Sequence, residues 1–227
     1  MKWSEHAAHL LRDYPNALRV RAASTHVRVP EPWATGTERV VVLIPGVYET
    51  WHFLNAVGDA LNAHGHPVHV IRSLGLNRAP IPASARIVAR ELAARDLHGV
   101  ALVAHSKGGL IGKQTMSTED PDGRVDRLVA VATPFRGSTM ARLTVGRTMR
   151  AFLPGDSVIR ALGELRDSNA RVTSIYPRFD PNIPEGSALD GATNIEIPVV
   201  GHFRVLDEPA TIAAVIAAVE REAAPEV

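Results

Sequence analysis

Short apolar runs rich in β-branched residues alternate with longer amphipathic stretches along this chain. Six of the runs are too continuous to be half-exposed, which is typical of strands that are covered on both faces of a sheet. They span residues 39–44, 67–71, 100–104, 127–132, 171–176 and 193–199. Helices are predicted over 51–64, 82–97, 107–117 and 204–222. The alternation predicts an α/β fold with a mostly parallel sheet and helices on both faces, in which ligands bind at the carboxyl ends of the strands.

The segment between the predicted strands at 127–132 and 171–176 is too long for a simple connection. It contains two helix-like pieces, 138–152 and 156–166, and we interpret it as a small helical lid inserted at about 138–168 in a single domain spanning 1–227. An apolar stripe on the first piece includes Leu143 and Phe152. The stripe either packs permanently as core or forms the substrate-binding wall of a mobile cover.

Composition narrows the class of protein. The chain has 227 residues, 45% of them hydrophobic, which is enough to bury a sizeable core. A net charge of +1 with both signs interspersed gives no basic surface for nucleic acid, and the absence of cysteine excludes disulfides and thiolate metal sites. The opening MKWSEHAAHLLRDYP lacks the apolar core of a signal peptide, and no run is long enough for a transmembrane segment. We expect a cytoplasmic protein, unless a signal peptide has already been removed, and its oligomeric state is left open.

One serine stands at a chemically suggestive position. GVALVAHSKGGLIGKQ, residues 99–114, places Ser106 between a predicted buried strand and a predicted helix. This is the context of a nucleophile elbow, where small residues such as Ala104 and Gly108 let strand and helix approach each other. The usual elbow pattern has glycine at the position of Ala104. A phosphate loop would need a glycine-rich run that ends in Lys-Ser or Lys-Thr, so that interpretation is rejected, whereas a plain structural turn stays open.

A serine becomes a useful nucleophile only when a base removes its proton. His202 is the only histidine after Ser106, and it lies between the last predicted strand and the last predicted helix. Asp180, in the loop YPRFDPNIP, follows the strand at 171–176 and is therefore expected at the same edge of the sheet, where it could orient the imidazole. The order Ser, Asp, His is the one expected for an elbow of this kind. Weaker candidates for the acid are Glu185, Asp190 and Asp167.

An oxyanion hole requires fixed N–H donors near the nucleophile. The predicted donors are the backbone amides of Lys107, which follows Ser106, and of Val47, which follows the Pro45-Gly46 turn after the first long strand. The charged side chain of Lys107 is expected to be solvated. Six further histidines are interpreted as structural rather than metal-binding: three in HGHPVH (His64, His66, His69) and three elsewhere (His52, His98, His105).

Three segments, IPGVYETWHFLNAVGDAL, AHSKGG and LDGATNIEIPVVGHFRVL, resemble the small bacterial triacylglycerol lipases and esterases of the α/β-hydrolase superfamily. ATPFRGS, residues 132–138, is similar to the T-P-x-x-G-S of that family, and the likeness spans residues 40–219. It implies an α/β-hydrolase fold with Ser106, Asp180 and His202 as catalytic triad and Val47 and Lys107 as oxyanion donors.

The expected function is that of a serine carboxylic-ester hydrolase acting on a small-molecule ester or lipid, with no metal and no cofactor. Two alternatives stay open, because one fold hosts many chemistries. The same triad could serve an acyltransferase or a thioesterase. The chain could also be a catalytically silent protein that keeps the pocket only to bind a ligand.

Overall fold

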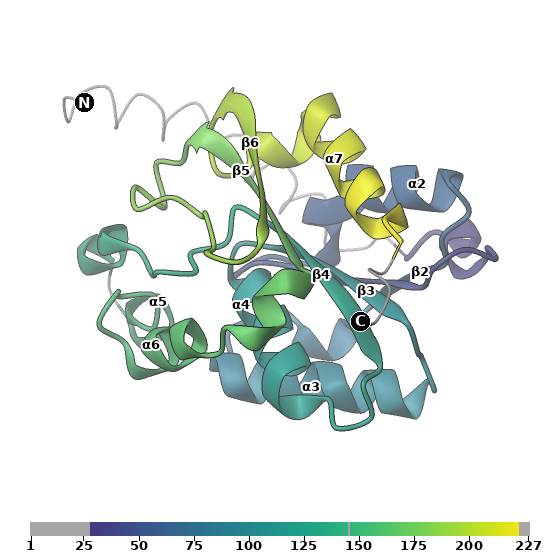
Figure 1. The fold of residues 1–227 in the computed structure, drawn as a ribbon, viewed down its shortest axis with the longest axis horizontal. Coiled ribbons are helices and arrows are strands. Elements are labelled where there is room, and N and C mark those ends of the chain that lie inside the picture. The colour runs from purple at the N-terminus through teal and green to yellow at the C-terminus, as the bar shows by residue number, and fades with distance from the viewer. Residues whose placement is uncertain (1–27, 145, 223–227) are drawn as a thin grey trace.

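A six-stranded sheet organises the molecule, and all of its strands are parallel (Figure 1). The computed structural model describes residues 28–144 and 146–222, so the opening segment MKWSEHAAHLLRDYP lies outside the described residues. In the sheet the strands follow the order β2-β1-β3-β4-β5-β6. Their bounds are β1 (Val41–Ile44), β2 (Val68–Val70), β3 (Val100–His105), β4 (Val125–Val131), β5 (Val172–Phe179) and β6 (Thr193–Val200). Each of the six predicted strands is therefore present, and the predicted parallel arrangement is confirmed.

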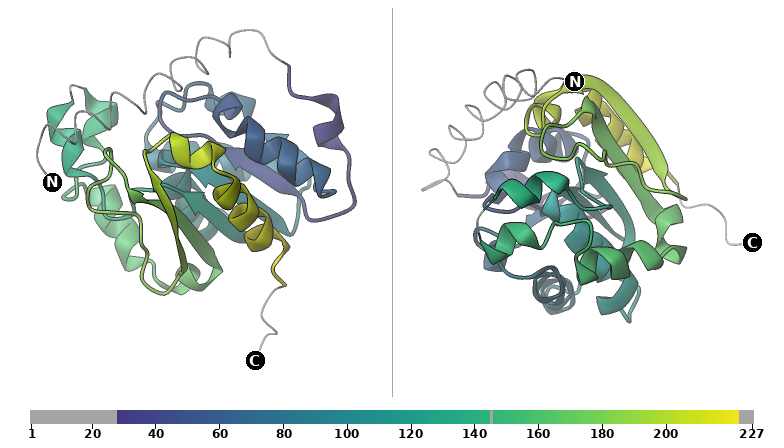
Figure 2. Two further views of the ribbon diagram at one scale, coloured as in Figure 1. Left: turned by 90° about the horizontal axis from the view of Figure 1, so that it is seen from above. Right: turned by 90° about the vertical axis from the view of Figure 1, so that its left-hand side faces the viewer.

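Two hydrophobic clusters cover the two faces of the sheet. Because side chains alternate along a strand, Val41 and Leu43 of β1 join one cluster whereas Val42 and Ile44 join the other. The first cluster packs under α2 (Asn55–Ala63) and α7 (Pro209–Glu220), and the second under α3 (Ile81–Ala94), α4 (Lys107–Gln114) and α6 (Ser157–Glu164). Figures 1 and 2 show these two helical layers on opposite sides of the sheet. Burial on both faces explains why the sequences of β1, β3 and β4 are continuously apolar. For the run at 193–199 the expectation of burial is wrong: β6 lies at the edge of the sheet, where only β5 pairs with it, and half of its residues are exposed.

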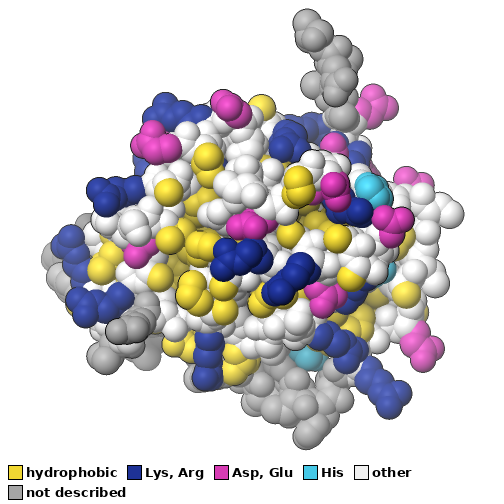
Figure 3. Space-filling model, turned by 90° about the horizontal axis from the view of Figure 1, so that it is seen from below, with side chains coloured by type: hydrophobic (Ala, Val, Ile, Leu, Met, Phe, Trp, Pro, Cys, Tyr) yellow, Lys and Arg dark blue, Asp and Glu magenta, His cyan; other side chains and the backbone are white. Residues whose placement is uncertain are grey.

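The outer surface carries charges of both signs. On the face seen in Figure 3, below α3 in the orientation of Figure 1, Lys and Arg side chains are interspersed with Asp and Glu. This mixture agrees with the net charge of +1 for the whole chain. Among the helices that the structure describes, none has both the length and the apolar character needed to cross a membrane.

The single helix predicted over 138–152 is wrong. The structure has a 3₁₀ helix (Thr139–Leu143) and a short α5 (Arg147–Arg150) in its place. Thr144 is extended, and Gly146 has a φ of 113°, outside the right-handed helical region, so the helix cannot continue between the two pieces. The segment closes on itself where the amide of Ser138 donates to the carbonyl of Phe152. The second predicted piece corresponds to α6, whose first turn is capped by Asp156.

Close backbone contacts fix the start of α4 against the sheet. A Cβ atom on Gly108 would lie 2.2 Å from the carbonyl oxygen of Ile44, at the end of β1. A Cβ atom on Gly109 would lie 2.0 Å from Oγ1 of Thr133, which follows β4. No side chain fits at either distance. The two glycines after Ser106 therefore let α4 begin directly against the carboxyl ends of β1 and β4.

The expectation that the Lys107 side chain is solvated is wrong. Lys107 is 2% exposed, and its ammonium donates to the carbonyls of Asn77 and Ala79 and to the side-chain oxygen of Asn77. Asn77 in turn donates from Nδ2 to the carbonyl of Pro45, 2.7 Å away. Burial lowers the pKa of Lys107 from its ordinary 10.5 to about 8. Lys107 thus joins the start of α4 to the loop after β2, and Asn77 joins that loop to the loop after β1.

The glycine at the start of α4 gives a first test of this packing. We expect Gly108→Ala to lower the free energy of unfolding by about 2 kcal/mol, because the new methyl group meets rigid backbone rather than a movable side chain. The matched control is Gly163→Ala in α6, where an added Cβ meets nothing within 4 Å and should raise stability by up to about 1 kcal/mol. Urea unfolding of both variants measures the difference, and equal changes in the two would contradict the packing argument.

Burial of Lys107 predicts a pH-dependent stability. Between pH 8 and 10.5 the unfolded chain binds the lysine proton more tightly than the folded chain does. The free energy of unfolding therefore increases as the pH rises. The Lys107→Met variant lacks this gain. We expect the difference in stability, wild type minus variant, to grow by about 2 kcal/mol between roughly pH 7 and pH 10 in urea unfolding. A difference that is constant or falls with pH would show that the folded state does not disfavour the charged lysine.

Candidate active site

Ser106 occupies the sharp turn between β3 and α4. Its backbone has a φ of 52° and a ψ of −120°, a left-handed conformation that is unfavourable for a residue with a side chain. Neighbouring groups hold it there: the amide of Ser106 donates to the carbonyl of Val131, and the Thr133 hydroxyl donates to the carbonyl of Ser106. The strained backbone is therefore fixed by β4 and the residues that follow it, and it directs the hydroxyl out of the carboxyl edge of the sheet.

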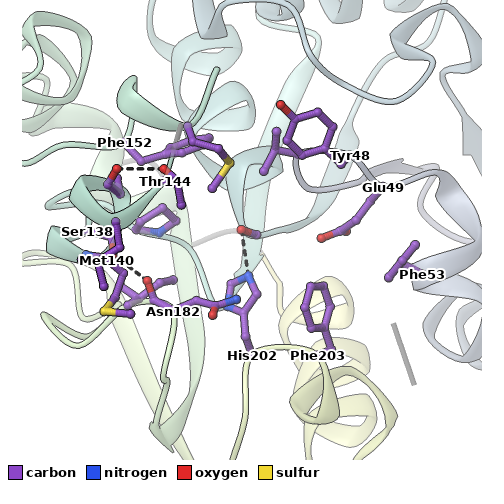
Figure 4. A pocket seen from close by; sticks show the side chains of 17 residues that line it. Tyr48, Glu49, Phe53, Ser138, Met140, Thr144, Phe152, Asn182, His202 and Phe203 are labelled. Carbon is purple, nitrogen blue, oxygen red and sulfur yellow. Dashed lines mark hydrogen bonds between the residues drawn. The ribbon is translucent and has the colours of Figure 1, made fainter. Parts of the chain in front are cut away.

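The structure brings Ser106, His202 and Asp180 into one hydrogen-bonded chain. Nε2 of His202 lies 3.0 Å from Oγ of Ser106, the bond drawn at His202 in Figure 4, and Nδ1 lies 2.7 Å from Oδ2 of Asp180. A carboxylate accepts, so Nδ1 carries the proton and Nε2 accepts from the serine hydroxyl. The other carboxylate oxygen of Asp180 accepts from the amides of Asn182 and Ile183. All three side chains are buried, and donors on both carboxylate oxygens fix the orientation of Asp180.

The weaker candidates for the acid lie elsewhere. Glu185 accepts from the amide of Thr139, 2.9 Å away, and so connects the loop after β5 to the segment that follows Ser138. Asp190 is exposed further along that loop. Asp167 opens the 3₁₀ helix (Asp167–Arg171) that leads into β5, at the amino end of the strand. Of the candidates that the sequence offered, the structure places Asp180 against His202.

The two predicted oxyanion donors belong to segments beside the serine. Lys107 is the first residue of α4, so its amide has no acceptor within the helix. Val47 lies in the loop after β1 and lines the same pocket as Ser106. Two contacts hold this loop: the amide of Tyr48 donates to the carbonyl of Leu76, and the amide of Gly46 donates to the Glu49 carboxylate. Within the described chain, the hydrogen bonds of the loops and turns include none donated by either amide.

An apolar cavity of about 490 Å³ opens at Ser106 and His202. Figure 4 shows Met140, Thr144 and Phe152 on one side of it and Tyr48 and Phe53 on the other. Leu143 also lines the cavity and is 62% exposed, whereas Phe152 is 5% exposed and belongs to the hydrophobic core as well. Phe152 therefore packs as core, one of the two roles considered for the stripe, whereas Leu143 lies at the exposed rim of the cavity. The remaining apolar lining comes from Val47, Pro134, Ala141, Met149, Ile183 and Phe203.

One feature of the site was missed from the sequence. His105 was interpreted as a local structural residue, but its ring joins a buried carboxylate, Glu49, to the backbone carbonyl of His202. The two side chains are 56 positions apart, so no spacing in the sequence connects them. The available signal was a carboxylate inside the apolar stretch IPGVYETW, three positions after the predicted turn glycine.

Solved structures of known hydrolases resemble this chain, although no protein-family profile and no curated protein matches its sequence. The mature lipase BlEst2 of Bacillus licheniformis superposes with a TM-score of 0.63 at 16% identity, over 86% of this chain and 95% of the lipase. Lipase B of Aspergillus fumigatus gives a TM-score of 0.66 at 18% identity, over 88% of this chain and 57% of that one. An extracellular α/β-hydrolase from a Paenibacillus species gives 0.58 at 18% identity, over 81% of this chain and 100% of its own. The likeness confirms the fold predicted from the sequence: the chain has the α/β-hydrolase fold.

Proposed function

We propose that the protein is a serine carboxylic-ester hydrolase of the lipase or esterase type, with Ser106 as nucleophile. The observation that carries the proposal is the hydrogen-bonded chain from Ser106 through His202 to Asp180 at the mouth of an apolar cavity. The structural neighbours named as lipases support the same reaction class at the level of the fold. No metal or cofactor takes part in the proposed reaction.

In the first half of the reaction, Oγ of Ser106 attacks the ester carbonyl carbon while its proton passes to Nε2 of His202. The carbonyl oxygen becomes an oxyanion, and the amides of Val47 and Lys107 stabilise it. Each such donor contributes roughly 3 kcal/mol to lowering the barrier. Asp180, held by the amides described above, stabilises the imidazolium. His202 then gives its proton to the leaving alcohol oxygen, and the acyl group stays on Ser106.

In the second half, water replaces the alcohol. His202 takes a proton from the water as its oxygen attacks the acyl carbon, and it returns a proton to Oγ of Ser106 when the acid leaves. The apolar walls limit the water around the reacting atoms, which strengthens the oxyanion contacts. Acylation by the ester and deacylation by water therefore depend on the same three side chains.

The cavity suits the acyl chain of the ester. Its lining is apolar apart from the reacting groups and a few polar side chains, among them Glu49, Ser138, Thr144 and Asn182. We propose that Leu143 and Phe152 contact the acyl chain, and that residues 138–168 form a lid over it within a single α/β-hydrolase domain. Leu143 at the rim would contact the distal carbons of a longer chain, which a short acid does not have.

Replacement of the triad residues tests the reaction. We expect Ser106→Ala to lower kcat for p-nitrophenyl butyrate by about a million-fold and to abolish labelling by a fluorophosphonate. Asp180→Asn should lower kcat by about ten-thousand-fold, because the amide favours the wrong imidazole tautomer. Folding, followed by thermal unfolding, should change little in Ser106→Ala.

The matched control for the acid is Glu185→Gln. Its side-chain oxygen can still accept from the amide of Thr139, so kcat should stay close to that of the wild type. A Ser106→Ala protein that keeps a tenth of the activity would exclude Ser106 as nucleophile. A large loss in Glu185→Gln with little loss in Asp180→Asn would move the role of the acid to Glu185.

The acyl-chain contacts are tested by comparing esters. We expect Leu143→Ala to lower kcat/KM for the octanoate ester roughly five- to thirty-fold, which corresponds to about 1–2 kcal/mol of lost transition-state binding. The acetate ester should be little affected. Because Leu143 is exposed, the Tm should stay unchanged. Phe152→Ala should lower kcat/KM for octanoate and also the Tm, since Phe152 is part of the core.

Leu153→Ala is the control, because Leu153 packs on the core beside Phe152 without lining the cavity. Its ratio of octanoate to acetate kcat/KM should equal that of the wild type. An equal fall for both esters in Leu143→Ala would show that this side chain does not contact the acyl chain.

A further inference from the structure

A second carboxylate and imidazole pair lies buried beside the proposed triad, with Glu49 in the lining of the cavity. Glu49 is 3% exposed and His105 is not exposed at all, and Nδ1 of His105 lies 2.9 and 3.0 Å from the two oxygens of the Glu49 carboxylate. Neither residue has a role in the reaction proposed above. Burying two ionisable groups costs free energy unless each is paired and hydrogen-bonded, so the pair requires an explanation.

The contacts of this pair reach the segments that carry the proposed reaction. Oε2 of Glu49 accepts from the amide of Gly46, 2.8 Å away, which directly precedes Val47. Nε2 of His105 lies 3.1 Å from the backbone carbonyl of His202, and the two imidazole rings are 4.7 Å apart. His105 itself is the residue before the nucleophile. One pair of side chains thus connects three segments: the loop after β1 that carries the proposed oxyanion donor Val47, called the oxyanion loop below, the elbow at Ser106, and the loop of the proposed base His202.

The oxyanion loop is shaped around this carboxylate. A Cβ atom on Gly46 would lie 2.3 Å from Oε1 of Glu49 and 2.7 Å from its carboxyl carbon. A side chain at position 46 would push the Glu49 carboxylate away from its hydrogen bonds with Gly46 and His105. Figure 4 shows Glu49 directed into the pocket region that His202 also faces. The absence of a side chain at position 46 and the carboxylate at position 49 therefore belong to one arrangement.

Hydrogen-bond chemistry fixes the number of protons on the pair. The carbonyl of His202 can only accept, so Nε2 of His105 carries a proton and donates it. The contact between Nδ1 and the carboxylate needs a further proton, whichever atom holds it. With these two protons the pair is neutral as a unit. His202 can then become an imidazolium beside the His105 ring without a second uncompensated positive charge next to it.

We infer that Glu49 and His105 are positioning residues, which hold the backbone of His202 and the Gly46–Val47 amides in the geometry that the reaction needs. The inference rests on the proposed ester hydrolysis. It predicts that loss of the hydrogen bonds of Glu49 lowers the rate of the chemical step rather than the affinity for the ester. Because part of the effect acts through His202 and part through the Gly46–Val47 amides, it should become smaller, but not vanish, once His202 is removed.

Three variants of Glu49 test this. We expect Glu49→Ala to lower kcat about a hundred-fold for both acetate and octanoate esters, with KM within two-fold of the wild type. Glu49→Asp, which keeps the charge but is one methylene too short for both partners, should lower kcat at least ten-fold. Glu49→Gln should stay within three-fold, because its amide can accept from Gly46 and donate to Nδ1 of a neutral His105.

Two further measurements separate positioning from general destabilisation. In a His202→Ala background, adding Glu49→Ala should lower the residual rate by a smaller factor than it lowers the rate of the wild type, because only the contribution through the Gly46–Val47 amides is left. The matched control is Asp120→Ala: this carboxylate also braces a loop, by accepting from the amides of Arg124 and Val125, but at the amino end of β4. Asp120→Ala should lower the Tm and leave kcat unchanged, which shows that loss of a bracing carboxylate alone does not slow the reaction.

Several outcomes would overturn the inference. The first is a folded Glu49→Ala or Glu49→Asp protein whose kcat stays within three-fold of the wild type. The second is a Glu49→Gln protein that is as slow as Glu49→Ala. The third is a set of variants that change only KM, or that lose activity on only one of the two esters. Should Glu49→Ala not fold, Glu49→Asp and Glu49→Gln decide the matter.

Wild-type protein is assayed and labelled with a fluorophosphonate in the same experiment. If it neither turns over nor labels, the proposed function fails and the inference with it, whereas an active wild type with unaffected variants removes the inference alone.

Discussion

The left-handed backbone of Ser106 is the constraint on which the rest of the site depends. A non-glycine residue with a φ of 52° is stable only where its surroundings leave it no alternative. The surroundings here are the parallel strands on either side of β3 and the start of α4. Gly108 and Gly109 allow the helix to begin against Ile44 and Thr133, because a side chain at either position would collide with them. The packing of helix on sheet thereby holds the serine at the edge where loops from β1, β5 and β6 converge.

Buried polar contacts give order to these loops, which have little regular structure of their own. Asp180 is held by two backbone amides, Lys107 joins α4 to the loop after β2, and Asn77 joins that loop to the one after β1. Glu49 and His105 add the connection to the loop of His202. A buried polar group left without a partner costs free energy, so each of these contacts penalises alternative loop conformations. Preorganisation of the proposed oxyanion loop follows from this penalty rather than from regular secondary structure.

Sequence and structure agree where local pattern alone decides the outcome. Continuous apolar runs predicted all six strands, and the inner strands β1, β3 and β4 are buried on both faces as expected, whereas β6 at the edge of the sheet is half-exposed. Ser106, Asp180 and His202 were expected to lie close together because the carboxyl ends of parallel strands share one edge of the sheet. Their side chains form hydrogen bonds to one another at that edge. The prediction of one helix over 138–152 was wrong because it rested on the apolar stripe alone and did not consider that the backbone at Gly146 leaves the helical region. Lys107 and the Glu49–His105 pair could not be predicted, since their partners come from segments 30 and 56 positions away.

The charges around the site suit a reaction that separates charge without creating any. Asp180 is negative and lies against the imidazole that would become positive, while the Glu49–His105 pair is neutral as a unit. Transfer of the serine proton produces an imidazolium and an oxyanion together, so the net charge of the pocket does not change during the proposed step. An apolar cavity opposes a new net charge strongly but opposes a new dipole much less, provided that fixed donors and acceptors already face its two ends. In the proposed reaction the carboxylate of Asp180 serves one of those ends and the amides of Val47 and Lys107 serve the other, so the apolar wall and the polar network support the same step.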